Sequence, residues 1–208
     1  MSAGIISSFL VWAALLALIL QLKKRPLRVR ILGAVAMAVS AIIPVSGLPV
    51  PLYIRAITGD LSILTQLLLA IYIINSITGI HSTPARKTAY QRLCFFILFT
   101  GLWFYPTTLG LTLFDPYRYG YITDPMHFIT LAYFFLGTLT LFFLKSLLTS
   151  SLLCLATISF YFGPLESTNY WDYMIDPVLT IGALIYLLAG AAATSSADSG
   201  KQPSRIHI

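Results

Sequence analysis

Charged residues are scarce in this sequence. They make up 10% of its 208 residues, whereas a soluble domain of ordinary composition contains about 25%. Only two cysteines occur, both within apolar segments, so a disulfide between extracytoplasmic loops is not expected. The sequence also lacks a CxxC pair, a P-loop, a GxGxxG motif and a Ser-nucleophile motif. We therefore predict no metal site and no cofactor, and no motif identifies a catalytic residue.

Apolar residues, in contrast, account for 58% of the chain, and its mean hydropathy is +0.85. They gather in uncharged runs whose length approaches that of a helix crossing a bilayer core of about 30 Å. This pattern predicts an all-α integral membrane protein.

Seven apolar segments predict about seven transmembrane helices in one domain, residues 1–194. The expected helices cover residues 5–22, 31–48, 61–80, 93–114, 128–144, 146–163 and 178–194. Lys145 alone interrupts the apolar run from 128 to 163, and we expect a helical hairpin there, because one helix of that length would extend about 54 Å. Residues 195–208 are polar and small, which predicts a disordered cytoplasmic tail.

The positions of the basic residues predict the orientation. A net charge of +6 would suggest a nucleic-acid partner in a soluble chain, but all Lys and Arg residues except Arg55 and Arg118 lie in alternate loops or in the tail. Because cytoplasmic loops accumulate such residues, we predict an N-terminus outside, a C-terminus in the cytoplasm and no nucleic-acid partner. The expected location is a bacterial inner membrane. No basic residue precedes the first apolar segment, so this segment is expected to be an uncleaved anchor.

Acidic residues concentrate on the opposite, extracytoplasmic side, where all except Asp198 are found. Asp60, Asp124 and Asp176 stand at the starts of predicted helices, and Pro follows the last two. An Asp oxygen satisfies the first N–H groups of a helix, and Pro suits the first helical position. We predict that these three residues are helix caps, which Asn can replace with little loss of stability.

The other charged residues on that side lack such an explanation and lie among Tyr and Trp. The predicted binding site comprises Arg55, Asp115, Arg118, Glu166, Asp172, Tyr117, Tyr119, Trp171 and Tyr173. Asp115 and Arg118 are close enough in sequence to pair, and Pro106 predicts a kink in the outer half of the fourth helix. If the loops converge there, these side chains line a cavity for a polar headgroup or a partner's loop. The alternative is an interfacial belt of aromatic residues without a ligand.

Three functions follow as hypotheses. The first is a small subunit that binds or stabilises another membrane protein of an envelope complex through its small-residue helices and aromatic outer face. The second is transport of a small molecule or a lipid-linked group, and the third is an extracytoplasmic-facing enzyme acting on a lipid-linked glycan or phospholipid. The expected partners are the bilayer and either another membrane protein or a lipid headgroup.

Overall fold

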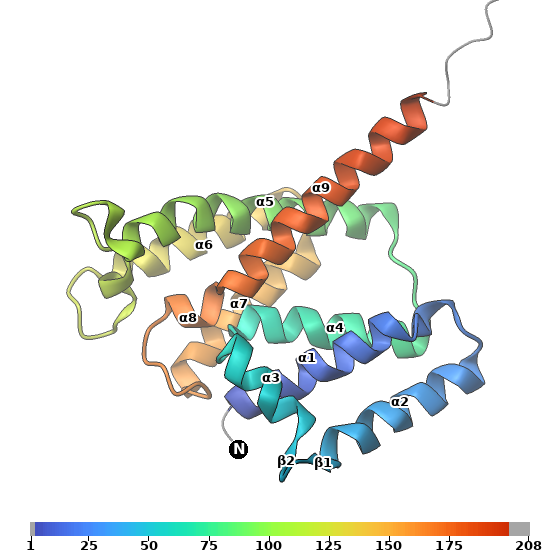
Figure 1. The fold of residues 1–208 in the computed structure, drawn as a ribbon. Coiled ribbons are helices and arrows are strands. Elements are labelled where there is room, and N and C mark those ends of the chain that lie inside the picture. The colour runs from blue at the N-terminus through green and yellow to red at the C-terminus, as the bar shows by residue number, and fades with distance from the viewer. Residues whose placement is uncertain (1–2, 200–208) are drawn as a thin grey trace, which may run out of the picture.

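Helices form most of the structure, a computed structural model that describes residues 3–199 (Figure 1). In chain order the elements are α1 (Ala3–Ile19), η1 (Leu22–Lys24), α2 (Leu27–Ile42), β1 (Pro44–Val45), β2 (Leu48–Pro49), α3 (Val50–Thr58), α4 (Ile63–Thr78), α5 (Pro84–Pro106), η2 (Thr107–Leu111), η3 (Tyr117–Gly120), α6 (His127–Phe143), α7 (Leu147–Phe162), α8 (Trp171–Met174) and α9 (Pro177–Ser199). The predicted all-helical class is confirmed, since β1 and β2 are the only named strands in the described part of the chain.

The number of helices able to cross a membrane differs from the prediction. Two helical stretches, Pro84–Leu111 and Trp171–Ala192, are long and apolar enough by length and composition. Four shorter apolar helices cover Ile5–Ile19, Ile63–Thr78, His127–Phe143 and Leu147–Phe162. A helix of 16 residues extends about 24 Å, which is less than a bilayer core of about 30 Å. The expected count of about seven transmembrane helices is therefore not supported.

Two helix ends also differ from the prediction. The helix expected to start at residue 93 begins at Pro84, because the Thr83 side chain accepts a hydrogen bond from the Arg86 N–H at 3.2 Å and Pro occupies the first turn. At the other end of the chain, α9 continues to Ser199, so residues 195–199 of the expected tail are helical. Residues 200–208 lie outside the described part.

The segment predicted as one helix over residues 31–48 is not helical throughout. Helix α2 ends at Ile42, and the chain then forms the antiparallel hairpin β1–β2 and the short helix α3. The hairpin turns at Ser46 and Gly47, which have φ values of 50° and 92°. Two consecutive positive φ values are typical of the tight turns that join antiparallel strands, and Pro44 interrupts the helix before them.

The helical hairpin at Lys145 is present as predicted. Helices α6 and α7 are separate, and Lys145 between them has a φ of 57°. The Arg92 guanidinium of α5 donates hydrogen bonds to the Leu144 carbonyl and the Ser146 hydroxyl. This contact links the turn between α6 and α7 to α5.

Pro106 ends the regular hydrogen bonding of α5. A π-helical turn, η2, follows it, and Gly110 within this turn has a φ of 80°. The Thr107 hydroxyl donates to the Trp103 and Phe104 carbonyls at 2.9 and 2.7 Å. The predicted kink is therefore a change of helix type at the C-terminal end of α5.

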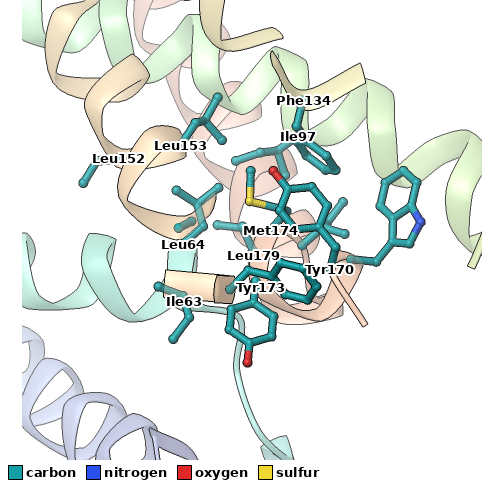
Figure 2. Packing of buried hydrophobic residues seen from close by; sticks show 14 of the residues in the cluster. Ile63, Leu64, Ile97, Phe134, Leu152, Leu153, Tyr170, Tyr173, Met174 and Leu179 are labelled. Carbon is teal, nitrogen blue, oxygen red and sulfur yellow. The ribbon is translucent and has the colours of Figure 1, made fainter. Parts of the chain in front are cut away.

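Buried side chains of α4 to α9 form the main hydrophobic core (Figure 2). Leu64, Leu153 and Met174 are fully buried within it, and Tyr170 and Tyr173 enter it from the segment around α8. Helix α9, red in Figure 1, crosses α5 and extends away from the other helices. A second, smaller cluster joins α1 to α2.

The buried carboxylate of Asp176 joins the N-termini of α4 and α9. Its Oδ1 accepts the Leu179 N–H at 2.7 Å, which confirms the predicted cap of α9. Its Oδ2 accepts the Ser62 N–H at 2.9 Å, the Ser62 hydroxyl at 2.7 Å and the Thr65 hydroxyl. Both oxygens are therefore used, and donors from two helices depend on them.

The other two predicted caps are corrected. Asp60 lies too early in the chain, because Ser62 is the N-cap of α4, and Asp60 instead pairs with Arg55 at 2.8 Å. Asp124 accepts the Met126 N–H at 2.8 Å, but Met126 itself is the N-cap residue of α6. Asp124 thus stabilises the turn that leads into the helix.

Asp176→Asn is expected to destabilise the protein, in contrast to the mild effect expected from sequence. The new NH2 group cannot accept the hydrogen bonds made to Oδ2, and an unpaired buried donor costs about 1–3 kcal/mol. Asp60→Asn is the matched control, since it removes a partly exposed ion pair that contributes about 0–1 kcal/mol. Thermal unfolding in detergent measures both. Equal melting temperatures for Asp176→Asn and the wild type would contradict this role.

Candidate functional site

Two loops converge at the end of the helices that was predicted to be extracytoplasmic. The segment 112–126 contacts the segment 163–176 through a β-bridge between Tyr121 and Asn169. The Tyr170 N–H donates to the Gly120 carbonyl at 2.9 Å, and the Asn169 amide donates to the Tyr117 carbonyl at 2.8 Å. The sequence predicted a cavity on the condition that these loops converge, and the structure shows that they do.

A cavity of about 410 Å³ lies between these loops, the C-terminal end of α5 and the start of α9. We call it the acidic cavity. Its polar lining residues are Asp60, Asp115, Asp172, Asp176, Tyr105, Thr108, Tyr117 and Ser167. Four of them carry carboxylates, and no Lys, Arg or His is among the lining residues that the structure describes. The lining is therefore rich in hydrogen-bond acceptors and negative charge.

The charge of this lining is only partly compensated. Arg55 lies beside the cavity and pairs with Asp60. Within the described residues, Asp115, Asp172 and Asp176 form no ion pair. Asp176 is buried, Asp172 is half-buried and Asp115 is exposed. Carboxylates without a basic partner favour an approaching cation.

Asp172 is held in place while one of its oxygens stays available. Its Oδ2 accepts hydrogen bonds from the Tyr117 hydroxyl at 2.8 Å and from the Ser167 hydroxyl. Burial, followed by the neighbouring Asp172, raises the pKa of Tyr117, so the phenol remains a proton donor. No hydrogen bond reaches Oδ1 from the described residues. A positioned carboxylate with a free oxygen is suited to accept a hydrogen bond from a ligand.

The structure brings several predicted site residues together. Asp115, Tyr117 and Asp172 line the acidic cavity. Arg55 and Glu166 lie outside its lining, where the guanidinium contacts the Glu166 carboxylate at 3.3 Å. Of the predicted residues, these three therefore line the cavity, and Arg55 and Glu166 form an ion pair beside it.

Arg118 does not pair with Asp115. Its guanidinium bonds to Asp124 at 3.1 Å and lies 5.5 Å from the centre of the Tyr119 ring. The Met126 N–H and Arg118 both hold the pKa of Asp124 below its usual value. The 3₁₀ turn η3 carries Arg118, and its pairing follows the fold of the loop rather than the spacing in sequence.

Trp171 and Tyr173 do not form an exposed platform of rings. Their exposed fractions are 2% and 1%, and both belong to the main core. The centre of the Trp171 indole lies 4.3 Å from that of the Phe104 ring, with the two planes tilted by 31°, and the indole N–H donates to the Pro116 carbonyl at 3.0 Å. These side chains support the cavity from within the protein.

Sequence reasoning missed part of the cavity. Tyr105 and Thr108 come from the helix interrupted by Pro106, and that interruption was the one signal that pointed to them. The Tyr105 hydroxyl oxygen is buried without a hydrogen-bond partner among the described residues. Ser167 had no signal of its own, because its role depends on contact with Asp172.

The chain matches no protein-family model, no curated protein and no solved structure. Among the described residues, no group of three or more His, Cys, Asp or Glu is arranged to hold a metal ion.

Gly120→Ala is expected to separate the two loops that enclose the cavity. A Cβ atom at this position would lie 1.8 Å from the Asn169 Oδ1 atom, and such overpacking costs about 1–3 kcal/mol. Gly182→Ala is the matched control, because a Cβ there meets nothing within 4 Å. Thermal unfolding should show a lower melting temperature for Gly120→Ala alone. An unchanged value would show that the loop contact is not required for stability.

Proposed function

We propose that this chain is a polytopic membrane protein whose acidic cavity binds a small organic cation at the extracytoplasmic surface. The observation that carries the proposal is the lining of the cavity, with four carboxylates and no basic side chain among its described residues. An ammonium group donates hydrogen bonds to carboxylates and hydroxyls, and such charge-assisted bonds are stronger than neutral ones.

Exposure of apolar side chains supports embedding in a membrane. Large apolar residues are exposed on α1, α2, α4, α5, α6, α7 and α9. Only 28% of the apolar window in each of the two longest stretches is buried inside the protein, whereas the core helix of a soluble protein is mostly buried. Lipid is the solvent that covers such surfaces at least cost.

The ends of the helices support the proposed orientation. The turn at Lys145 and the start of α5 carry basic residues, whereas the opposite end carries the acidic cavity. We propose that the basic end faces the cytoplasm, as the positive-inside rule requires in a bacterial inner membrane. In this arrangement the two long stretches and the four shorter apolar helices lie in the bilayer, the shorter ones where lipid and headgroups adapt to their length.

A binding role retains the core of the first hypothesis and replaces its protein partner by a small cation. The cavity is concave, and its volume falls within the range of about 300–1,000 Å³ typical of small-molecule sites. Trp171 and Tyr173, which were expected to contact a partner, are buried in the core. Thus a small ligand fits this end of the protein better than a partner's surface.

Orientation can be tested by cysteine labelling in intact cells, in a variant with Cys94 and Cys154 replaced by Ser. A membrane-impermeant maleimide should label Glu166→Cys, whose parent side chain is 67% exposed at the acidic end. Lys87→Cys, at the basic end, should react only after the membrane is permeabilised. The reverse pattern would place the acidic cavity in the cytoplasm.

Cation binding can be measured by calorimetry with butylammonium and the protein in lipid nanodiscs. Asp172→Asn should weaken binding at least tenfold, since a hydrogen bond to a charged group contributes about 1.5–3 kcal/mol. Glu166→Gln should bind like the wild type, because this residue lies on the same end but outside the cavity lining. No binding by the wild type, or equal losses in both variants, would refute a cation site in the acidic cavity.

A further inference from the structure

An apolar groove lies between α4, α5 and α9. It has a volume of about 320 Å³ and is lined mainly by apolar side chains. Residues from each helix include Leu68, Leu93, Cys94, Ile97, Gly182 and Ala183. The groove therefore offers a surface for hydrocarbon and few polar groups.

The groove and the acidic cavity are neighbours, separated by Asp176 and its hydrogen-bond partners. This residue lines the cavity, and its carboxylate accepts hydrogen bonds from the Thr65 hydroxyl and the Leu179 N–H. Thr65 and Leu179 in turn line the groove. An acceptor-rich hollow and an apolar hollow therefore lie on either side of one hydrogen-bonded junction.

We propose that the two hollows bind one amphipathic molecule, a single-chain lipid amine without phosphate. This inference rests on the proposed cation site, and it assigns the ammonium head to the acidic cavity and the hydrocarbon chain to the groove. The carboxylates of Asp115 and Asp172 repel a phosphate or carboxylate head, so anionic and phosphate-bearing lipids are disfavoured. Burial of the chain adds affinity in proportion to its apolar area.

Contact of the groove with the surrounding bilayer, as well as charge, favours a lipid as the occupant. Helix α9 exposes Ile181 and Ile185 beside groove residues Gly182 and Ala183. A lipid in the surrounding bilayer can thus reach the groove laterally, while its head stays at the end of the helices where the carboxylates lie. A water-soluble amine would use the cavity alone.

Binding of dodecylamine and butylamine, both protonated at neutral pH, distinguishes the head site from the groove. Calorimetry in nanodiscs, with empty nanodiscs as the baseline for partition into lipid, should give at least tenfold tighter binding of dodecylamine. Gly182→Leu fills open space in the groove. This substitution should weaken dodecylamine binding at least fivefold without changing the binding of butylamine. Ala189→Leu, on the same helix but outside the groove lining, should leave the binding of both amines unchanged.

The wild-type chain provides a second test that needs no substitution. Cys94 lines the groove, whereas Cys154 is exposed on α7 and lies outside its lining. Dodecylamine should slow the reaction of Cys94 with N-ethylmaleimide, as measured by peptide mass spectrometry, and leave Cys154 unaffected. Butylamine should protect neither thiol.

The outcomes separate the two proposals. Butylamine binding that requires Asp172, without added affinity or Cys94 protection from dodecylamine, would overturn the groove assignment and retain the cation site. Equal binding of dodecanoate and dodecylamine would overturn the choice of an amine. Absence of binding by both amines would overturn the cation site and the inference built on it.

Discussion

The carboxylate of Asp176 is the interaction on which the acidic end of the protein depends. It accepts hydrogen bonds from the N-terminal residues of α4 and α9, whose unsatisfied N–H groups and helix dipoles both favour a negative charge. Because α9 also packs against α5, this contact helps to position the three helices that border the groove. The same residue lines the cavity, so helix capping and a candidate binding surface share one side chain.

Buried aromatic residues support the acidic end of the protein from within the core. Trp171 packs on Phe104 and bonds to the Pro116 carbonyl, which joins the segment before α9 to the end of α5 and to the loop after it. Aromatic pairs of this kind combine large buried areas with specific geometry. The rings therefore determine where the carboxylates lie, even though the buried rings themselves are not available to a ligand.

The acidic cavity and the apolar groove place opposite chemistries next to each other. Asp172 keeps one oxygen free of hydrogen bonds from the described residues, while the groove is lined mainly by apolar side chains. Carboxylates are tolerated at this position because hydroxyl and backbone donors compensate for lost water. Proximity of the two surfaces makes an amphipathic cation a better match than a purely polar or purely apolar molecule.

Much of the helical structure was predictable from sequence, because local apolar runs and breaks determine where helices form. The segment 128–144 matches α6, and Lys145 correctly marked the turn before α7. Local patterns did not identify α3, and they overestimated the number of helices long enough to cross a membrane, because length in sequence includes turns that do not extend the helix.

Only the tertiary structure decided the contacts of the acidic end. Sequence spacing favoured a pair between Asp115 and Arg118, whereas the folded loop brings Arg118 to Asp124. It also placed Trp171 in a ring platform, although helix packing buries it. Hydrophobicity and capping act between near neighbours and can be seen in a sequence, but partners and burial depend on how distant segments pack, which no local pattern records.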